Sequence, residues 1–561
     1  MKLTPKDHTF NNPMICHIMP KHIELDRVLI NLYMLLKYDG RRPVARTGRI
    51  QVTVDYIVEQ LVQQHSDTLK GFRDHSDVVW DWVYSDLVDV VYRGVPDKET
   101  VAAPLPLHLN AYKLRNPKQA KDYRGAEHLF SMIRGGDPGL VARLAAFLGQ
   151  GMDPANYDTY DGETSLDLET LIIVRMVDNP HLRESPSTSG SVPEPPLCSG
   201  QARLLCNDLR RLLAYESVIP RPVLIGYLRT ALGLHLGLYL LRLFHQVAGW
   251  VRDKEPRAIC LNCPVDPESE RPFVECAYAF QNPGASQNAP LSELLVDMGE
   301  DYTTHLAQLS RESCARHYGW INDYIHAVFT INQMNRFCAS DRGRHHLARV
   351  PESVAELVAL LERPPSGLLD YFSDRLDDIL PQDGLGEERP EIQAVYEMTE
   401  LSSLERFVEL VALERTRYYR RYLTEQLDSV LMKNRATCVL RQGKGKKNER
   451  RWHIGSRLLE MLVQIAVLEP TGSQIDVGFR SRPILLDEFV NWLGERYGFA
   501  LVLDRPGATI QDYEAFNANL RHLKQRLREI GFYRDLSDAY VAQTITPRYD
   551  IEGVEAEGWR A

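Results

Sequence analysis

The chain has 561 residues, with 66 Lys and Arg against 76 Asp and Glu and a formal net charge of −10. At roughly 100–200 residues per domain this length suggests about three to four domains, and 44% hydrophobic with 25% charged residues excludes a disordered or fibrous protein. The acidity argues against a protein that coats nucleic acid or anionic lipid with its whole surface, although a local basic site is still allowed.

Three features predict a cytoplasmic protein without membrane contact. The N-terminal MKLTPKDHTF has no apolar run of the kind that a secretory signal requires. The most apolar stretch, Ala231–Val251, carries His235, Arg242 and His245, which favour a buried helix over a membrane span. Nine cysteines are a sparse and odd set, as expected for reduced thiols rather than for a disulfide framework.

The spacing of apolar residues predicts a mainly α, multidomain protein. Three- and four-residue spacing dominates from Ile23 to Val90, as in amphipathic helices, whereas the Ser- and Pro-rich stretch at 184–200 is typical of a linker. Short strands are expected around Arg257–Leu261. We expect a helical N-terminal domain at 1–183, a linker at 184–200, a central mainly helical domain with a Cys-bearing segment at 201–350, an acidic helical hinge at 351–414, a basic helix and loop at 415–455, a winged-helix-like domain at 456–547 and a tail at 548–561.

The clearest local architecture lies in the C-terminal module. Apolar spacing and turn residues predict helices at Ser456–Leu468, Pro483–Tyr497 and Asp512–Ile530, a short strand at Ile475–Phe479 and a hairpin within Phe532–Pro547. This order resembles a winged helix-turn-helix. It departs from that pattern at Phe499–Gln511, which is longer than the usual turn of 3–4 residues. Modules of this kind bind DNA, but they also serve as structural or protein-docking units.

The third predicted helix of this module has a polar face opposite its apolar stripe. Side chains that can hydrogen-bond bases or phosphates gather there and on its flank. They are Asn517, Arg521, Lys524, Gln525 and Arg528.

A basic stretch precedes the module. Arg415–Arg457 holds 13 basic and 3 acidic residues, a local charge of +10. Cations neutralise phosphates, and Tyr418, Tyr419, Tyr422 and Trp452 are candidates for stacking on bases. Two alternatives stay open: a solvated surface with the tyrosines in the core, or pairing with residues 351–400, which hold 13 acidic and 3 basic residues. The candidate contacts to DNA are Arg417, Arg420, Arg421, Arg441, Lys444, Lys446, Lys447, Arg450 and Arg451.

Two Cys-containing pairs have the ligand types of a structural zinc site. Cys260 and Cys263 form a CxxC, and Cys314 and His317 form a CxxH about 50 residues later. Together they would complete a closed tetrahedral Cys3His site, for which Cys276 is a competing ligand. Buried thiols in the core and redox chemistry are the alternatives.

Signatures of common enzymes are missing from the sequence. The segment RQGKGKKN does not fit the nucleotide-binding P-loop, and neither HExxH nor GxSxG occurs. We therefore assign no catalytic residue.

The overall build resembles a family of defence proteins. The resemblance rests on the helical N-terminal half, the central GLHLGLYLLRLFHQVAGWV followed by CLNCP, the segment MGEDYTTHLAQLSRE, and the basic stretch that precedes the terminal module. Together these are similar to accessory proteins of bacterial anti-phage islands, the methylation-associated defence systems. The resemblance implies a non-catalytic component that works beside a methyltransferase, a specificity subunit and ATPases.

Three functional hypotheses follow. The first is a DNA-binding accessory or sensor component of such a system, which contacts DNA through the basic stretch and the winged helix. The second is a scaffold that joins protein subunits without touching DNA. The third is a nuclease whose active site is not contiguous in sequence.

Overall fold

The structure is mainly helical, as the sequence predicts. The helices take up 58% of it and the strands 9%. The computed structural model describes residues 3–44, 52–65, 68–95, 98–178, 187–266, 276, 294–379, 390–432, 434–435, 437–443, 449–471, 478–502, 508–533 and 543–551.

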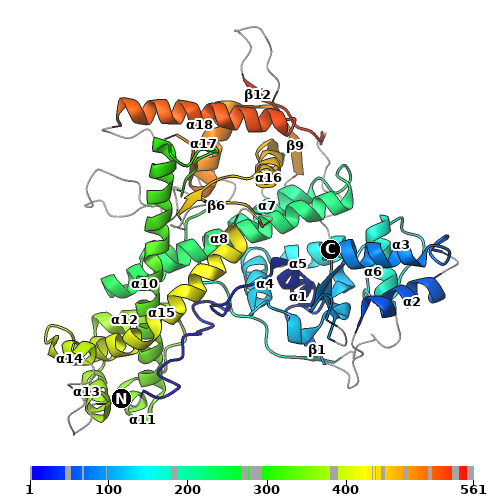
Figure 1. The fold of residues 1–561 in the computed structure, drawn as a ribbon. Helices are drawn as coiled ribbons and strands as arrows, with labels where there is room; N and C mark the ends of the chain where they lie inside the picture. Colours follow the sequence, from blue (N-terminus) through cyan, green and yellow to red (C-terminus); the bar gives the residue numbers. More distant parts are fainter. Residues whose placement is uncertain are drawn as a thin grey trace.

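The N-terminal region packs short helices around the buried helix α1 (Leu25–Lys37), at the right of Figure 1. Its strands β1 (Arg42–Pro43) and β4 (Thr188–Ser189) pair antiparallel, so part of the predicted linker joins this region. The other elements are α2 (Val54–Gln64), α3 (Ser76–Trp82), a π-helix at Val83–Leu87, the hairpin β2 (Val88–Val91) and β3 (Thr100–Pro104), 3-10 turns at Leu109–Leu114 and Pro117–Gln119, α4 (Gly125–Gly136), α5 (Pro138–Leu148) and α6 (Leu168–Val177).

Long helices form the centre of the molecule. They are α7 (Ser199–Leu213), α8 (Arg221–Asp253), α10 (His305–Ala339) and α15 (Ser403–Leu431). Helix α8 is long and apolar enough to cross a membrane, but 83% of its most apolar window is buried by the rest of the protein. That degree of burial is typical of the core helix of a soluble protein.

Short elements surround the long helices. The prediction of short strands around Arg257–Leu261 is wrong, because Ala258–Leu261 forms the single-turn helix α9. The predicted acidic hinge is helical, with α12 (Val354–Glu362), α13 (Leu368–Ile379) and α14 (Pro390–Glu397). These helices lie at the lower left of Figure 1, together with α11 (Asp341–His346) of the preceding stretch.

The C-terminal region lies at the top of Figure 1 and follows the predicted order of helices closely. Its helix α17 (Leu486–Tyr497) is followed by Gly498, whose φ of 84° is the left-handed conformation that glycine adopts readily and that ends a helix. Its elements are β6 (Leu440–Gln442), β7 (Arg450–Trp452), α16 (Ser456–Ala466), β8 (Leu468–Thr471), β9 (Gly478–Ser481), β10 (Ile484–Leu485), α17 (Leu486–Tyr497), β11 (Phe499–Ala500), α18 (Ile510–Glu529) and β12 (Thr544–Ile545).

Sheet pairing in this region is short and partly long-range. Strand β6 pairs with β7, β8 with β9 and β10 with β12, all antiparallel. Ile545 also bridges to Tyr533, just after α18. Strand β11 instead runs parallel to β5 (Leu294–Leu295) from the central region. The long connection between α17 and α18 therefore attaches the C-terminal region to the centre of the molecule.

One apolar core extends through all these regions, from Phe10 to Ile551. The N-terminal strap, residues 3–24, also contributes to it. Its second half contacts the N-terminal region, where the Met19 amide donates to the Tyr123 carbonyl at 2.9 Å, and its first half lies on the central helices. Phe10 stacks on Tyr419 of α15 with ring centroids 4.2 Å apart, and Asn12 donates a hydrogen bond to Asn332 of α10 over 2.9 Å. The strap thus covers α10 and α15.

A buried polar network fastens α17 to α7 and α8. The Asp208 carboxylate accepts hydrogen bonds from His235 Nε2 at 2.8 Å, from Tyr497 Oη at 2.6 Å and from Arg496 Nε at 3.1 Å. Burial opposes the ionised carboxyl, but the Arg496 guanidinium and the His235 hydrogen bond hold the pKa of Asp208 below its usual range. Removing Arg496 would leave the buried Asp208 charge without a countercharge.

Three buried histidines stay neutral because water cannot solvate their charged form. Burial lowers the pKa of His108, His128 and His453 to about 3, with nearby positive charges adding to the effect. Unfolding restores an ordinary pKa, so between about pH 6.5 and 3 the unfolded chain binds more protons than the folded chain.

We predict that the free energy of unfolding falls as the pH is lowered from 6.5, by about 1.4 kcal/mol per pH unit for each such histidine. Urea denaturation of the full chain at several pH values measures this slope. In His128→Phe the slope should be shallower by about 1.4 kcal/mol per pH unit. An unchanged slope in that variant would show that His128 takes up no proton on unfolding.

A second prediction concerns the contact between α4 and α7. A Cβ atom at Gly136 would lie 2.5 Å from the backbone oxygen of Ala202, which cannot move aside as a flexible side chain does. Gly136→Ala should therefore lower the free energy of unfolding by about 1–3 kcal/mol. Gly319→Ala is the matched control, because a Cβ there meets nothing within 4 Å; it should raise stability by up to about 1 kcal/mol through helix propensity. Equal effects would refute the close contact.

Candidate nucleic-acid interface

Helix α18 presents the predicted polar face to solvent. Its opposite face is buried through Phe516, Asn519, Leu523 and Leu527. Thr509 caps the helix by accepting from the Asp512 amide at 3.2 Å, and Asp512 accepts in return from the Thr509 amide at 2.8 Å. The side chains predicted to contact DNA are exposed at Asn517, Arg521, Gln525 and Arg528, and half-buried at Lys524.

The 294–301 segment holds α18 and the β6–β7 hairpin together. Asn519 of α18 accepts from the Met298 amide at 2.9 Å and donates to the Val296 carbonyl at 2.9 Å. On the surface, Glu300 accepts from Arg441 of β6 at 2.5 Å and also from Arg526 of α18. The hairpin and the helix therefore share one acidic side chain, and the basic stretch and the C-terminal module are adjacent in space.

The base of the hairpin is buried, which corrects two expectations. Arg451 and Trp452 are both 0% exposed. Arg451 is paired with Asp297 and donates to the carbonyls of Gly299 and Asp301, each at 2.9 Å. Neither side chain can reach a phosphate or a base in this conformation. We therefore no longer count Arg451 among the candidate DNA contacts or Trp452 among the candidate stacking residues.

Other cations of the basic stretch are partly neutralised within the chain. Arg450 binds Asp428 with an N···O distance of 2.8 Å, and Arg435 binds Glu24 at 3.0 Å. These partners, like Glu300 and Asp297, lie outside residues 351–400. These arginines therefore do not pair with residues 351–400, as one of the two alternatives had it, but with acidic side chains elsewhere in the chain. Lys444, Lys446 and Lys447 lie outside the residues that the structure describes.

Helix α15 carries the other exposed part of the basic stretch. Arg417, Arg420 and Arg421 are exposed, and Arg421 pairs with Glu425 one turn later at 2.8 Å. Tyr418 is 42% exposed, and Lys21 of the N-terminal strap lies 4.1 Å from the Tyr422 ring centroid. Tyr419, in contrast, packs inward on Phe10. In Figure 1, β6 lies between the upper, C-terminal end of α15 and α18.

A cleft of about 480 Å³ opens between α10 and the base of the hairpin. Arg311 and Arg450 line it, and each is paired with an acid, Arg311 with Glu449 at 3.1 Å and Arg450 with Asp428. Tyr318 donates to the same Asp428 at 2.9 Å. The cleft wall is thus polar but electrically balanced.

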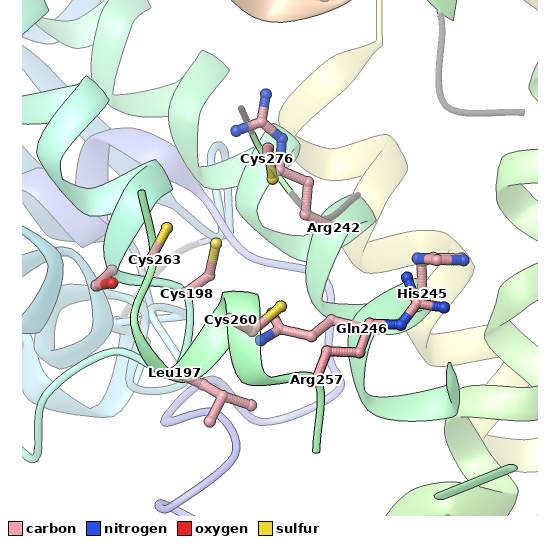
Figure 2. Close-up of a pocket in the computed structure, with 10 residues that line it drawn as sticks. Leu197, Cys198, Arg242, His245, Gln246, Arg257, Cys260, Cys263 and Cys276 are labelled. Carbon is pink, nitrogen blue, oxygen red and sulfur yellow. The ribbon is translucent and has the colours of Figure 1, made fainter. Parts of the chain in front are cut away.

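The structure separates the two halves of the predicted zinc site. Cys314 lines the cleft beside Arg450, and His317 packs edge-on against Trp452 with ring centroids 5.5 Å apart. Cys260 and Cys263 line a different cavity, shown in Figure 2. The predicted Cys3His set is therefore not assembled. Sequence reasoning also missed Cys198, which lines that second cavity, because Cys198 lies far before the CxxC and belongs to no local motif.

We predict that Arg451 acts through stability and not through contact with DNA. Arg451→Met leaves Asp297 buried without a countercharge and should lower the free energy of unfolding by about 3–5 kcal/mol. Arg420→Met, the same replacement on the exposed face of α15, should change it by less than about 0.5 kcal/mol. Urea denaturation measures both values, and similar losses in the two variants would contradict the buried ion pair.

Comparison with known proteins identifies the family. The model of the methylation-associated defense system protein MAD7 family matches residues 5–549. No curated protein and no solved structure matches the chain. The expected resemblance to methylation-associated defence proteins is confirmed, since the match spans nearly the whole sequence. The chain belongs to the MAD7 family of bacterial methylation-associated defence system proteins.

Proposed function

We propose that this protein is a non-catalytic, DNA-contacting accessory component of its defence system, and that it acts in the cytoplasm with other components of that system. The observation that carries the proposal is the outward face of α18. Arg521, Gln525 and Arg528 recur there at helical spacing, on a helix whose other face is fixed in the core. Such a face can reach phosphates and base edges without any rearrangement of the fold.

The strand pairing after α18 supports a winged-helix-like arrangement. Ile545 lies between Ile484 of β10, to which it pairs, and Tyr533, to which it bridges. The order α16, β10, α17, α18, Tyr533 and β12 is the one expected for three helices with a small sheet. Residues 534–542, where the sequence predicts part of the hairpin, lie outside the described residues. In this proposal α18 takes the place of the recognition helix.

The exposed cations of α15 extend the contact. Arg417, Arg420 and Arg421 would bind the phosphate backbone, with Tyr418 beside them. We also propose phosphate contacts for Lys444, Lys446 and Lys447, on the basis of the sequence alone. Because Arg441 and Arg450 already have acidic partners, we assign them a positioning role in the hairpin. Contacts of this type give affinity but little sequence preference.

We predict that the purified full chain binds duplex DNA with a strong salt dependence. Reversing Arg521, Lys524 and Arg528 to Glu should weaken binding at least tenfold and reduce the slope of log K against log salt by about 2–3. Fluorescence anisotropy with labelled duplex, single-stranded and methylated DNA at about 50 and 200 mM salt measures both quantities.

The matched control reverses three exposed cations elsewhere, Lys70, Arg73 and Arg363, and so makes the same change in net charge. This control should keep most of the affinity. If both triple variants lose binding equally, the α18 face is not the site. If the wild-type chain binds no DNA at either salt concentration, the proposal fails, and co-purification with other system components free of nucleic acid would favour the scaffold.

A further inference from the structure

Four cysteines from three separate segments line one small cavity. Cys198 precedes the first turn of α7, Cys260 lies in α9, Cys263 follows α9, and Cys276 lies further along the chain. The cavity measures about 30 Å³ and lies near the C-terminal part of α8. Figure 2 shows the four sulfur atoms around this space, with Arg242 beside Cys276. All four thiols are free of disulfides.

The main apolar core accounts for only part of this group, since Cys198 belongs to it and Cys260 packs against it. Cys263 and Cys276 group with Val265 in a cluster of three residues that is separate from the main core. Cys260 and Cys263 are only half-buried, and Leu261 between them is 52% exposed. A segment with so little apolar surface to bury needs another source of stability, and in small protein units a structural metal commonly supplies it.

The surroundings suit a group of thiolates around a dication. Zinc with four thiolate ligands carries a net charge of −2, and the buried Arg242 together with Arg257 lines the same cavity. Cys198 also lies at the N-terminal, positive end of α7. The thiols are close enough to interact, since the pKa of Cys198 and of Cys260 is raised to about 12 by burial and then further by Cys276. The cavity wall therefore combines four sulfur atoms with two arginines that can offset their charge.

We propose that Cys198, Cys260, Cys263 and Cys276 bind one structural Zn²⁺, which fastens the segment after α8 to the start of α7. Among the described residues no group of three or more Cys, His, Asp or Glu side chains stands ready to hold a metal ion. Binding therefore requires the sulfur atoms to turn inward, which a Cys side chain achieves by a single χ1 rotation. Four protein ligands leave no open position for substrate, so the site is structural and not catalytic.

The first test is the zinc content of the purified full chain. Elemental analysis should find about one Zn²⁺ per chain, as for a single closed site. Cys263→Ser and Cys198→Ser should lose it, whereas Cys314→Ser should keep it, because Cys314 lines the other cleft. A folded wild-type chain without zinc would overturn the proposal. So would loss of zinc in Cys314→Ser with retention in Cys263→Ser.

A second measurement covers the case in which the serine variants do not fold. Wild-type protein loaded with Co²⁺ in place of Zn²⁺ should show the intense thiolate-to-metal charge-transfer absorption and the visible bands of a tetrahedral site with four sulfur ligands. Bands of an octahedral or mainly oxygen-ligated Co²⁺ would contradict it. Thiol titration of the unfolded, metal-free chain should find all nine cysteines; a count lower by two would indicate a Cys260–Cys263 disulfide and would also overturn the proposal.

Discussion

The buried ion pair between Arg451 and Asp297 determines how the C-terminal half of the molecule is assembled. A buried charge is stable only when it is paired and hydrogen-bonded. The two terminal nitrogens of the Arg451 guanidinium bond to the Asp297 carboxylate and to the carbonyls of Gly299 and Asp301, whereas its Nε is buried without a partner among the described residues. These bonds fix the path of the 294–301 segment, and that segment in turn positions both the β6–β7 hairpin and α18. The orientation of the exposed surface therefore follows from a charge that solvent never reaches.

A second buried charge makes the same region rigid from the other side. Asp208 joins α7 to Arg496 and Tyr497 at the end of α17, while β11 pairs with β5. The C-terminal region is thus tied to the central region both at the end of α17 and just after it. A DNA-binding module on a flexible tether can search for its site independently of the rest of the chain. Here, in contrast, α18 would orient the whole molecule on whatever it contacts.

Local signals in the sequence were enough to predict the helices but not their partners. The apolar spacing of α8, α16 and α18 is complete within each segment, and Gly498 marks the end of α17 by its own conformational preference. In contrast, the partner of Arg451 lies 154 residues earlier in the chain. Composition shows that a stretch is basic, but it does not show which arginines are already neutralised. The same reason explains why CxxC was found and its neighbour Cys198 was not.

The two-residue strands also could not be predicted from the local sequence. Strands β5 and β11 exist because the centre of the molecule brings Leu294 beside Phe499, and neither segment has the length of an independent strand. Around Arg257–Leu261 the predicted strands gave way to one helical turn, Ala258–Leu261. Short strands of this kind form only when tertiary packing brings their partners together.

The N-terminal strap has a consequence for biosynthesis. Phe10 is synthesised more than 400 residues before its stacking partner Tyr419. At about 5–20 residues per second the strap waits roughly 20–80 s for α15. Until then the apolar side chain of Phe10 lacks one of the two helices that it packs against. The contact between the strap and α15 is therefore formed late in synthesis.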